Sequence, residues 1–205
     1  MSKVRTATSV SVLHTPSETV SRVLLRKTLL THPQKVKDNP KTKHHTMATT
    51  DLSAYNPKEV PSGKGKKVTI IVSEWNGDVT RNLLKGALDT LLKYDIKEDD
   101  ITVKWVPGSF ELIYSCSYEI RHKLRIPDGV IALGAIVRGE TPHFDYIAEA
   151  TTVNLGRLNA DGLRPVIMGV LTTDTMQQAL DRSGGIHGNK GVEAAVTLLK
   201  MMARF

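Results

Sequence analysis

The chain has 205 residues and a formal charge of +7, from 28 Lys and Arg against 21 Asp and Glu. This length suits one domain, or one domain with a tail. Residues 1–46 hold nine of the basic residues but only two of the acidic ones, so residues 47–205 carry nineteen of each and are formally neutral. Because nucleic-acid binding depends on a basic surface, the neutral body argues against a nucleic-acid partner.

The single cysteine and the hydropathy of the chain argue against a disulfide-linked, a cysteine-metal and a membrane-spanning protein. Cys116 is the only cysteine, so no intramolecular disulfide or cysteine metal cluster can form, which fits a reducing compartment such as the cytoplasm. Its flanking residues predict a helix without a basic neighbour, which favours a structural role over a nucleophilic one. No apolar run approaches the roughly 20 residues that a membrane span needs, so no membrane partner is expected. The His and acidic residues show no metal-ligand spacing, so no metal is expected.

The N-terminal part of the chain divides into two segments. Residues 1–46 are basic and rich in Ser and Thr, a composition that predicts disorder. Three interpretations stay open: a natural start at Met47, a transit peptide for a plastid or another organelle, or a genuine disordered arm. Residues 47–66 are polar, and Pro57 and Pro61 disfavour a regular helix there. They predict either an extended arm on a neighbouring subunit or a loose linker.

From residue 67 onward, strand and helix patterns alternate. Apolar strand runs are predicted at 68–73, 101–106, 130–137 and 165–171. Helical spacing is predicted at 79–92, at about 110–123, at 142–158, in a short helix after 174 and in a last helix after 188. Strands that are apolar on both faces and alternate with helices predict a parallel sheet covered on both sides. Residues 67–205 are therefore expected to form a three-layer α/β/α, flavodoxin-like sandwich with a four-stranded parallel sheet.

Two of these helices carry start signals. Thr141 and Pro142 are predicted as the N-cap and first residue of one helix, and Asp174 with Gln177 resembles a capping box at another. His143 would then be the second helical residue, where the helix dipole favours a neutral imidazole that accepts a proton. The alternative is a solvated histidine without a role.

The carboxyl ends of parallel strands form the edge where ligands bind. After the first strand, Trp75 offers a flat surface for stacking on a planar heterocycle, and Asn76 offers a hydrogen-bonding group. After the second strand, Ser109 and Phe110 offer backbone donors and Glu111 offers a carboxylate. Structural alternatives exist, because Trp75 could pack under a loop and Glu111 could be a first-turn acid favoured by the dipole.

Charged residues follow the third strand and flank a later glycine-rich segment. Arg138, Glu140 and Thr141 precede a helix start, where free amides suit an anion, and Arg138 is expected either to contact ligand or to pair with an acid. Arg182 and Lys190 flank a Gly-rich turn and are candidates for holding a phosphate. Together these residues predict a cofactor-free site for a planar heterocycle and a phosphorylated small molecule.

Residues from about 66 to 205 resemble the 6,7-dimethyl-8-ribityllumazine synthases of riboflavin biosynthesis. The resemblance implies that 5-amino-6-(D-ribitylamino)uracil condenses with 3,4-dihydroxy-2-butanone 4-phosphate without a cofactor, releasing phosphate and water. Positioning of the two reactants is then expected to supply most of the catalysis. The resemblance is carried by five ordered motifs: Glu74–Asn76, Val106–Glu111, Leu133–His143, Gly169–Thr173 and Gly188–Gly191.

The resemblance also implies roles by position. Trp75, where the family often has Phe, would stack on the pyrimidine, and His143 would transfer protons. Glu140 and Thr141 would bind the butanone phosphate, with Arg182 as its counter-charge and Lys190 nearby. The substituted uracil and its ribityl chain would be held by Ser109, Phe110 and Glu111, over a floor formed by Ala135, Ile136 and Val137.

Three further positions depart from the family pattern, and the resemblance also implies an oligomer. Met168 stands where a ring-bearing residue is common, which predicts a softer pocket wall for a neighbouring subunit, and Pro142 and Ala135 replace frequent Thr positions. The family builds sites between subunits of a pentamer, and some members close into a 60-subunit shell, so a homo-oligomer is expected. Riboflavin synthase is a candidate partner. The rival hypotheses are a non-catalytic flavin or lumazine binder and a cage protein.

Overall fold

The computed structural model describes residues 53–121 and 126–205. The predictions made for residues 1–46, and for the first part of the 47–66 segment, lie outside the described residues. From Ser53 onward the N-terminal segment is described, and a continuous chain leads from it into the first strand.

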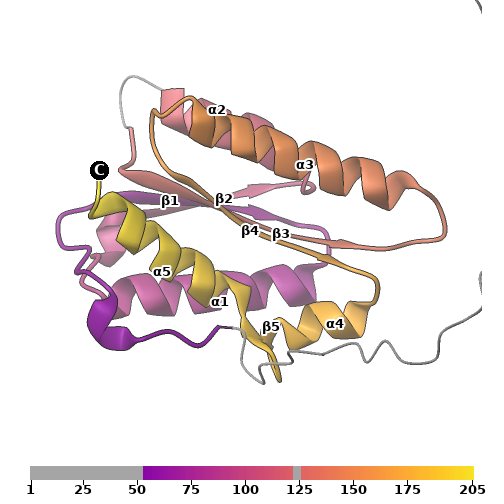
Figure 1. Ribbon diagram of the computed structural model, residues 1–205, viewed down its shortest axis with the longest axis horizontal. Coiled ribbons are helices and arrows are strands. Elements are labelled where there is room, and N and C mark those ends of the chain that lie inside the picture. The colour runs from indigo at the N-terminus through magenta and orange to yellow at the C-terminus, as the bar shows by residue number, and fades with distance from the viewer. Residues whose placement is uncertain (1–52, 122–125) are drawn as a thin grey trace, which may run out of the picture. The chain divides into compact units, whose positions relative to one another are not determined.

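Four parallel strands form the central sheet in the order β2-β1-β3-β4 (Figure 1). Val68 of β1 lies opposite Ile101 of β2 and Gly129 of β3, and β3 pairs with β4 over eight residues. The predicted four-stranded parallel sheet is confirmed, and the order of the strands within it comes from the structure. The strands span Val68–Ser73 (β1), Ile101–Val106 (β2), Gly129–Val137 (β3) and Val166–Thr173 (β4).

Burial along the strands follows their place in the sheet. Every residue of β1 is buried, and all of β3 is buried except its half-buried last residue, Val137. These two strands lie at the centre, so their continuous apolar runs face helices on both sides. By contrast, β2 is an edge strand with half-buried and exposed positions, and its Trp105 is 43% exposed.

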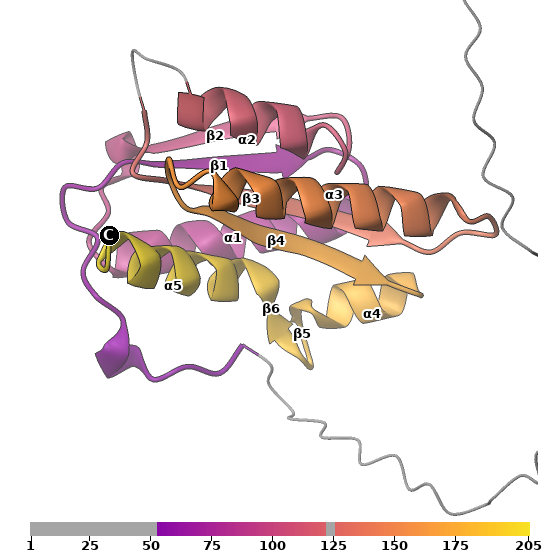
Figure 2. The same ribbon diagram turned by 45° about the horizontal axis from the view of Figure 1, so that its top comes forward.

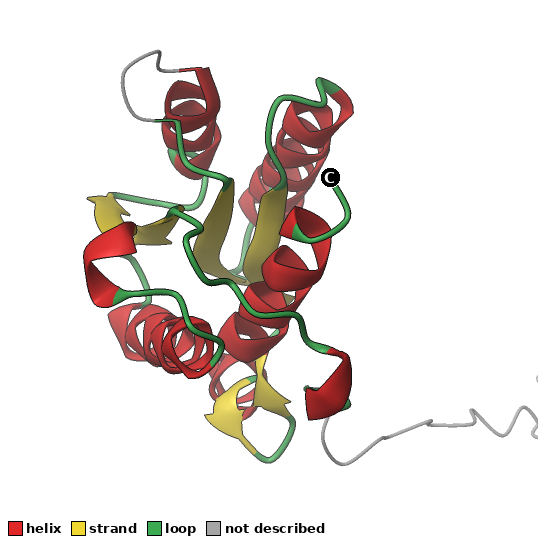
Figure 3. Cartoon of the chain, turned by 90° about the vertical axis from the view of Figure 1, so that its left-hand side faces the viewer, coloured by secondary structure: helices red, strands yellow, loops and turns green. Residues whose placement is uncertain are grey.

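Helices cover both faces of the sheet, which confirms the three-layer architecture (Figures 1 and 3). Helices α2 and α3 lie on one face, and α1 and α5 lie on the other (Figures 1 and 2). Helix α1 packs through a stripe at Val79, Leu83, Ala87 and Leu91, the four-residue spacing that places side chains on one helix face. The helices span Gly77–Lys93 (α1), Leu112–Arg121 (α2), His143–Ala160 (α3), Met176–Asp181 (α4) and Lys190–Met202 (α5).

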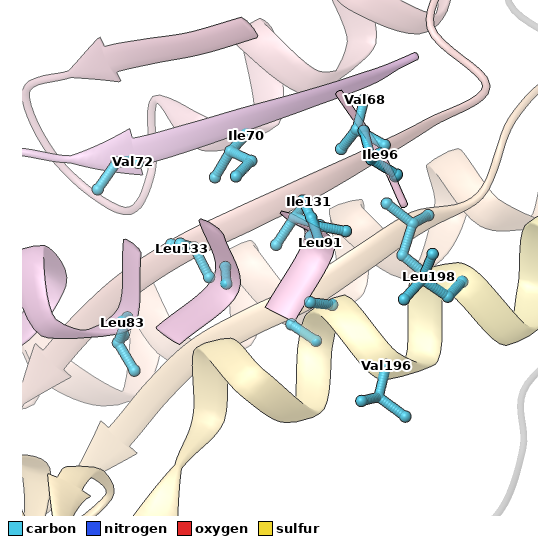
Figure 4. Packing of buried hydrophobic residues seen from close by; sticks show 14 of the residues in the cluster. Val68, Ile70, Val72, Leu83, Leu91, Ile96, Ile131, Leu133, Val196 and Leu198 are labelled. Atoms are coloured by element: carbon cyan, nitrogen blue, oxygen red, sulfur yellow. The ribbon is translucent and has the colours of Figure 1, made fainter. Parts of the chain in front are cut away.

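Each face of the sheet has its own apolar cluster. The larger cluster, between the sheet and helices α1 and α5, includes Ile70, Leu83, Ile131 and Leu198, all fully buried (Figure 4). The second cluster lies under α2 and α3 and includes Leu112 and Leu155. Together the two clusters fix the strand ends relative to the helix starts, where the candidate site lies.

Both predicted helix starts are displaced by one residue. Pro142, not Thr141, is the N-cap of α3, because the Asp145 amide donates to the Pro142 carbonyl oxygen, and His143 is the first helical residue rather than the second. At α4 the capping box is formed by Thr175 and Gln178 rather than by Asp174 and Gln177. Thr175 caps α4 because its hydroxyl oxygen accepts a hydrogen bond from the backbone N–H of Gln178 at 3.2 Å.

The N-terminal segment and a hairpin complete the fold. A short 3₁₀ helix spans Pro57–Glu59, so the two prolines exclude a regular α-helix as predicted, and Val60 is buried against the larger cluster. A second 3₁₀ helix spans Glu98–Asp100. Where the sequence indicated only a Gly-rich turn, antiparallel strands Ser183–Gly185 (β5) and Gly188–Asn189 (β6) form a hairpin leading into α5. Within the described ranges, no helix is long and apolar enough to cross a membrane.

Candidate active site

A cleft of about 430 Å³ opens at the carboxyl edge of the sheet, between the ends of β1, β2 and β3 and the start of α3. Most of the predicted site residues from these three strand ends line it. The lining residues are Trp75, Asn76, Ser109, Phe110, Glu111, Ala135, Ile136, Val137, Gly139, Thr141, His143, Phe144 and Ile147.

Asn76 holds two strand ends together at the cleft. Its backbone adopts the left-handed conformation (φ 59°), which asparagine tolerates better than most residues, and this turns the chain from β1 into α1. The side-chain amide then donates to the carbonyl oxygen of Ala135 at 2.8 Å. The side-chain nitrogen of the predicted ligand-binding residue is therefore engaged in joining β1 to β3.

Two aromatic side chains expose their faces at the cleft. Trp75 is 68% exposed and Phe110 is 50% exposed, although both are large apolar groups. Trp75 lies against the chain at Gly108, where a methyl group would come within 2.8 Å of the indole. This close approach keeps the indole over the second strand end, as stacking on a planar ligand requires, and the alternative of a Trp packed under a loop is not what the structure has.

A carboxylate oxygen lies buried in the same place. Glu111 Oε2 is inaccessible to solvent and has no hydrogen-bond partner in the described part of the chain. An unpaired buried carboxylate oxygen is costly, so such atoms in native proteins usually mark a ligand, ion or water position. Glu111 therefore brings to the cleft lining a carboxylate whose Oε2 has unused hydrogen-bonding capacity within the described residues.

Ser109 and the glycine opposite it shape the cleft floor. Ser109 is buried, and its carbonyl oxygen accepts a hydrogen bond from Thr151 of α3 at 3.5 Å. A methyl group at Gly134 of β3 would lie 2.6 Å from the Ser109 hydroxyl oxygen. Glycine at this position lets Ser109, which precedes α2, approach β3 closely.

The rim of the cleft is the turn from β3 into α3. His143 is exposed on the first turn of α3, and the predicted residue Thr141 lies beside it in the turn. Phe144 and Ile147, which the sequence did not single out, line the cleft from the same helix. The signal for Ile147 was available, because residues 143 and 147 are four apart and share a helix face.

Arg138 is engaged by acids of its own chain. Its guanidinium pairs with Asp145 Oδ1 at 2.9 Å and with Asp174 Oδ1 at 2.8 Å, and it lies over the ring of Phe144. The hydrogen bonds that the guanidinium donates to Asp145 and Asp174 raise the pKa of Arg138 above its already high ordinary value. Of the two open interpretations, pairing with an acid is the one that the structure supports.

Arg182 and Lys190 do not line this cleft in the same chain. They lie at the β5–β6 hairpin, where Arg182 donates to Glu193 Oε1 at 2.7 Å and Lys190 donates to Glu193 Oε2 at 2.8 Å. Burial alone would raise the pKa of Glu193, but hydrogen bonds from Lys190, Ser53 and Arg182 outweigh it and hold that pKa below its usual range. The two predicted phosphate-binding cations are thus gathered on one carboxylate, at a place separate from the cleft.

Three further residues lie outside the cleft lining. Glu140 is exposed in the β3–α3 turn, and Met168 of β4 is half-buried against the cluster under α2 and α3. Cys116 is fully buried, and burial together with the charge of Glu119 raises the pKa of its thiol to about 12, which supports the structural role predicted for it. Among the described side chains, no group of three or more His, Cys, Asp or Glu residues is arranged to hold a metal ion.

Comparison with known proteins identifies the family. A family model described as 6,7-dimethyl-8-ribityllumazine synthase matches residues 65–205. The chain is 53% identical over 158 residues to the 6,7-dimethyl-8-ribityllumazine synthase of Porphyromonas gingivalis, which covers 76% of this chain and 96% of that protein. It is 49% identical over 158 residues to that of Phocaeicola vulgatus (76% and 93% covered) and 44% identical over 141 residues to that of Lactiplantibacillus plantarum (69% and 87% covered). The chain therefore belongs to the 6,7-dimethyl-8-ribityllumazine synthase family.

Proposed function

We propose that this protein is a 6,7-dimethyl-8-ribityllumazine synthase, which condenses 5-amino-6-(D-ribitylamino)uracil with 3,4-dihydroxy-2-butanone 4-phosphate in riboflavin biosynthesis. The observation that carries the proposal is the content of the cleft. Two exposed aromatic side chains, a buried carboxylate oxygen without a hydrogen-bond partner among the described residues and a histidine on a helix start all meet at one sheet edge. Such a cleft fits a flat, polar heterocycle and a proton-transfer step.

The substituted uracil would occupy the inner part of the cleft. Trp75 and Phe110 offer aromatic surface for the pyrimidine ring, and the carboxylate of Glu111 accepts from an N–H or ribityl O–H group. Ser109 adds a polar group at the floor, while Ala135, Ile136 and Val137 supply the apolar surface beneath the ring. This division of apolar floor and few polar groups is typical of sites for planar ligands.

The phosphate-bearing substrate would bind at the rim. Amides of the turn through Glu140 and Thr141 precede α3, and a helix start favours an anion. Arg182 and Lys190 would supply the counter-charge from a neighbouring copy of the chain, because in one chain they lie at the hairpin and not in the cleft. We therefore propose a homo-oligomer, a pentamer or a shell of pentamers, with sites shared between subunits and with Met168 facing the neighbour's cleft.

The reaction needs little chemistry from the protein beyond positioning and proton transfer. The aromatic amine attacks the ketone, and loss of water gives an imine. The phosphate then leaves with its bonding electrons, the second amine closes the ring, and a further water is lost. His143, on the cleft rim, would move protons during these steps, and fixing the two reactants in place removes much of the entropic barrier.

A fluorescence assay tests the proposal directly. The purified chain is mixed with both substrates, and formation of the yellow fluorescent lumazine is followed for the parent and for Arg182→Ala. Lys85→Ala removes another cation of the same chain, one that pairs with Asp89 on the surface of α1, and serves as the matched control. Product from the parent and the control, with little from Arg182→Ala, supports both the reaction and the phosphate role.

Two other outcomes would redirect the proposal. A folded, assembled parent that makes no product but changes the spectrum of added lumazine or flavin would be a binder. A parent that does neither would be a cage protein.

Where the protein acts is a separate proposal. We propose the cytoplasm, supported by a single cysteine that is buried as a free thiol. Imaging fluorescent fusions of the full chain and of residues 47–205 tests it, because import of the full chain alone into an organelle would assign residues 1–46 as a transit peptide.

A further inference from the structure

The N-terminal segment makes two hydrogen bonds at the hairpin that holds the basic pair. The Ser53 hydroxyl donates to Glu193 Oε1 at 2.9 Å, and its oxygen accepts from the Asn189 amide at 2.7 Å. These partners lie 140 and 136 residues away along the chain. Ser53 is itself buried, with 9% of its surface exposed, and both bonds are partly shielded from water.

Both bonds fall on groups that set the position of Arg182 and Lys190. Glu193 accepts from both cations, and Arg182 also donates to the His187 carbonyl oxygen at 2.7 Å. Asn189 is the N-cap of α5 and immediately precedes Lys190. A serine from the N-terminal segment therefore joins the carboxylate that orients both cations to the helix start that carries one of them.

The charge balance leaves this cluster able to attract an anion. One carboxylate faces two cations, so the cluster keeps a net positive charge. Arg182 has five N–H donors and uses two side-chain nitrogens in the bonds described, while the Lys190 ammonium makes one. The remaining donors can meet a phosphate only if the carboxylate holds the two side chains in fixed orientations.

We infer that Ser53 is a positioning residue for the phosphate-binding pair Arg182 and Lys190, and that it acts through Glu193 and Asn189. The inference rests on the proposed function, in which these cations bind the phosphate of the butanone substrate. Without the Ser53 hydroxyl, Glu193 loses its only neutral side-chain donor among the described contacts. The backbone N–H of Asn189 loses the oxygen to which it donates. The side chains of Arg182 and Lys190 then become more mobile. The phosphate group is held less tightly both in the substrate complex and in the transition state.

Equal weakening of substrate and transition state predicts a specific kinetic pattern. In the full chain, Ser53→Ala should raise KM for the butanone phosphate about 3–10-fold, while kcat and KM for the uracil substrate stay within about 2-fold. The inhibition constant of inorganic phosphate should rise by the same factor. General damage to the fold would instead change kcat and both KM values.

An isosteric pair and a matched serine make the test sharp. Ser53→Thr keeps the hydroxyl and should retain the parent KM, whereas Ser53→Val has the same shape without the hydroxyl and should behave like Ser53→Ala. Ser62→Ala removes another hydroxyl of the N-terminal segment. This hydroxyl donates to Asp95 at 2.7 Å, apart from the cation cluster, so the substitution should leave every kinetic parameter unchanged. Size-exclusion chromatography shows whether each variant assembles as the parent does.

The inference and the proposed function fail in different ways. Unchanged KM and phosphate inhibition in Ser53→Val beside Ser53→Thr, or the same rise in Ser62→Ala, would overturn the inference while leaving the synthase intact. A parent that makes no product would overturn the proposed function. In that case calorimetric titration with inorganic phosphate still decides the inference, because Ser53→Val must bind it more weakly than Ser53→Thr.

Discussion

The guanidinium of Arg138 lies over the ring of Phe144, with its central carbon 4.0 Å from the ring centroid. The same side chain pairs with Asp145 in the first turn of α3 and with Asp174 after β4. One residue thus joins three segments at the carboxyl edge of the sheet. Because Phe144 lines the cleft and directly follows His143, Arg138 orients the rim on which the proposed proton-transfer group lies.

Replacing Arg138 should therefore affect activity more than stability. Arg138→Ala is expected to lower kcat/KM about 10-fold, since the rim loses its clamp and a small misplacement of reacting groups is costly. Its melting temperature should change little, because the ion pairs are exposed. Arg138→Lys should recover only part of the activity, because an ammonium cannot form the planar fork. Full activity of Arg138→Ala in steady-state assays would show that the clamp is dispensable.

Loss of the rim histidine should slow turnover without abolishing it. His143→Ala is expected to lower kcat by a factor on the order of 10²–10⁴, the usual contribution of a general acid–base. The remaining rate reflects positioning of the two substrates, and KM should change less than kcat. Steady-state fluorescence kinetics, with the uncatalysed reaction as the baseline, measure the effect. Complete loss in a folded, assembled variant would contradict the positioning account.

The close approach of Gly134 to Ser109 predicts that a larger side chain at position 134 lowers the stability of the fold. In Gly134→Ala the new methyl group would lie 2.6 Å from the Ser109 hydroxyl oxygen and 3.1 Å from Leu112 Cδ1, so the variant should lose about 1–3 kcal/mol of stability. Gly156→Ala is the matched control near the C-terminal end of α3, where no atom outside the adjacent residues and the helix's own backbone lies within 4 Å of the new methyl. It should gain about 0.5–1 kcal/mol through its higher helix propensity. Guanidinium unfolding at equal protein concentration compares the two, and equal stabilities would rule out the close contact.

The buried thiol predicts a pH dependence of stability. Burial raises the pKa of Cys116 from 9.0 to about 12, so its contribution to stability is complete below about pH 9 and is lost as the pH rises towards 12. The stability difference between the parent and Cys116→Ala should shrink by about 1.4 kcal/mol between pH 8 and pH 10. Urea unfolding at both pH values measures this difference. A difference that stays constant would mean that the folded thiol titrates normally.

The thiol should also be unreactive in the folded protein. A thiol reagent at pH 8 is expected to label Cys116 only under denaturing conditions, because the thiolate is the nucleophile and the folded state suppresses it. Rapid labelling of the native protein would show that the site opens.

Local sequence patterns predicted the fold because each element satisfies its own rules. The apolar runs of β1 and β3 match strands buried on both faces, and the four-residue spacing in α1 matches a helix with one buried face. Chain order alone then places the carboxyl ends of the strands on one edge. Trp75, Ser109 and Glu111 could be assigned to one cleft for that reason, although they come from different parts of the chain.

Capping and charge pairing were predicted less well, because short-range signals compete. Thr175 and Asp174 are both good N-cap residues, and the choice between them depends on Asp174 pairing with Arg138 from another strand end. The assignment of Thr141 as an N-cap failed because the carbonyl oxygen of Pro142 accepts the first helical hydrogen bond. The first outcome involves a partner distant in sequence, whereas the second depends on backbone geometry that the residue types alone do not specify.

By itself, the sequence determined the layers, the parallel sheet and the edge at which the candidate site lies, because hydrophobic periodicity and strand order are local properties of the chain. Only the tertiary structure decided how the polar groups are partnered. It placed Arg138 on Asp145 and Asp174 and left Glu111 Oε2 without a hydrogen-bond partner in the part of the chain that is described. It also gathered Arg182 and Lys190 on Glu193 beside Ser53 rather than in the cleft. Charged side chains are long and have several possible partners, so their pairing is fixed by which segments meet in space, and spacing along the chain does not encode it.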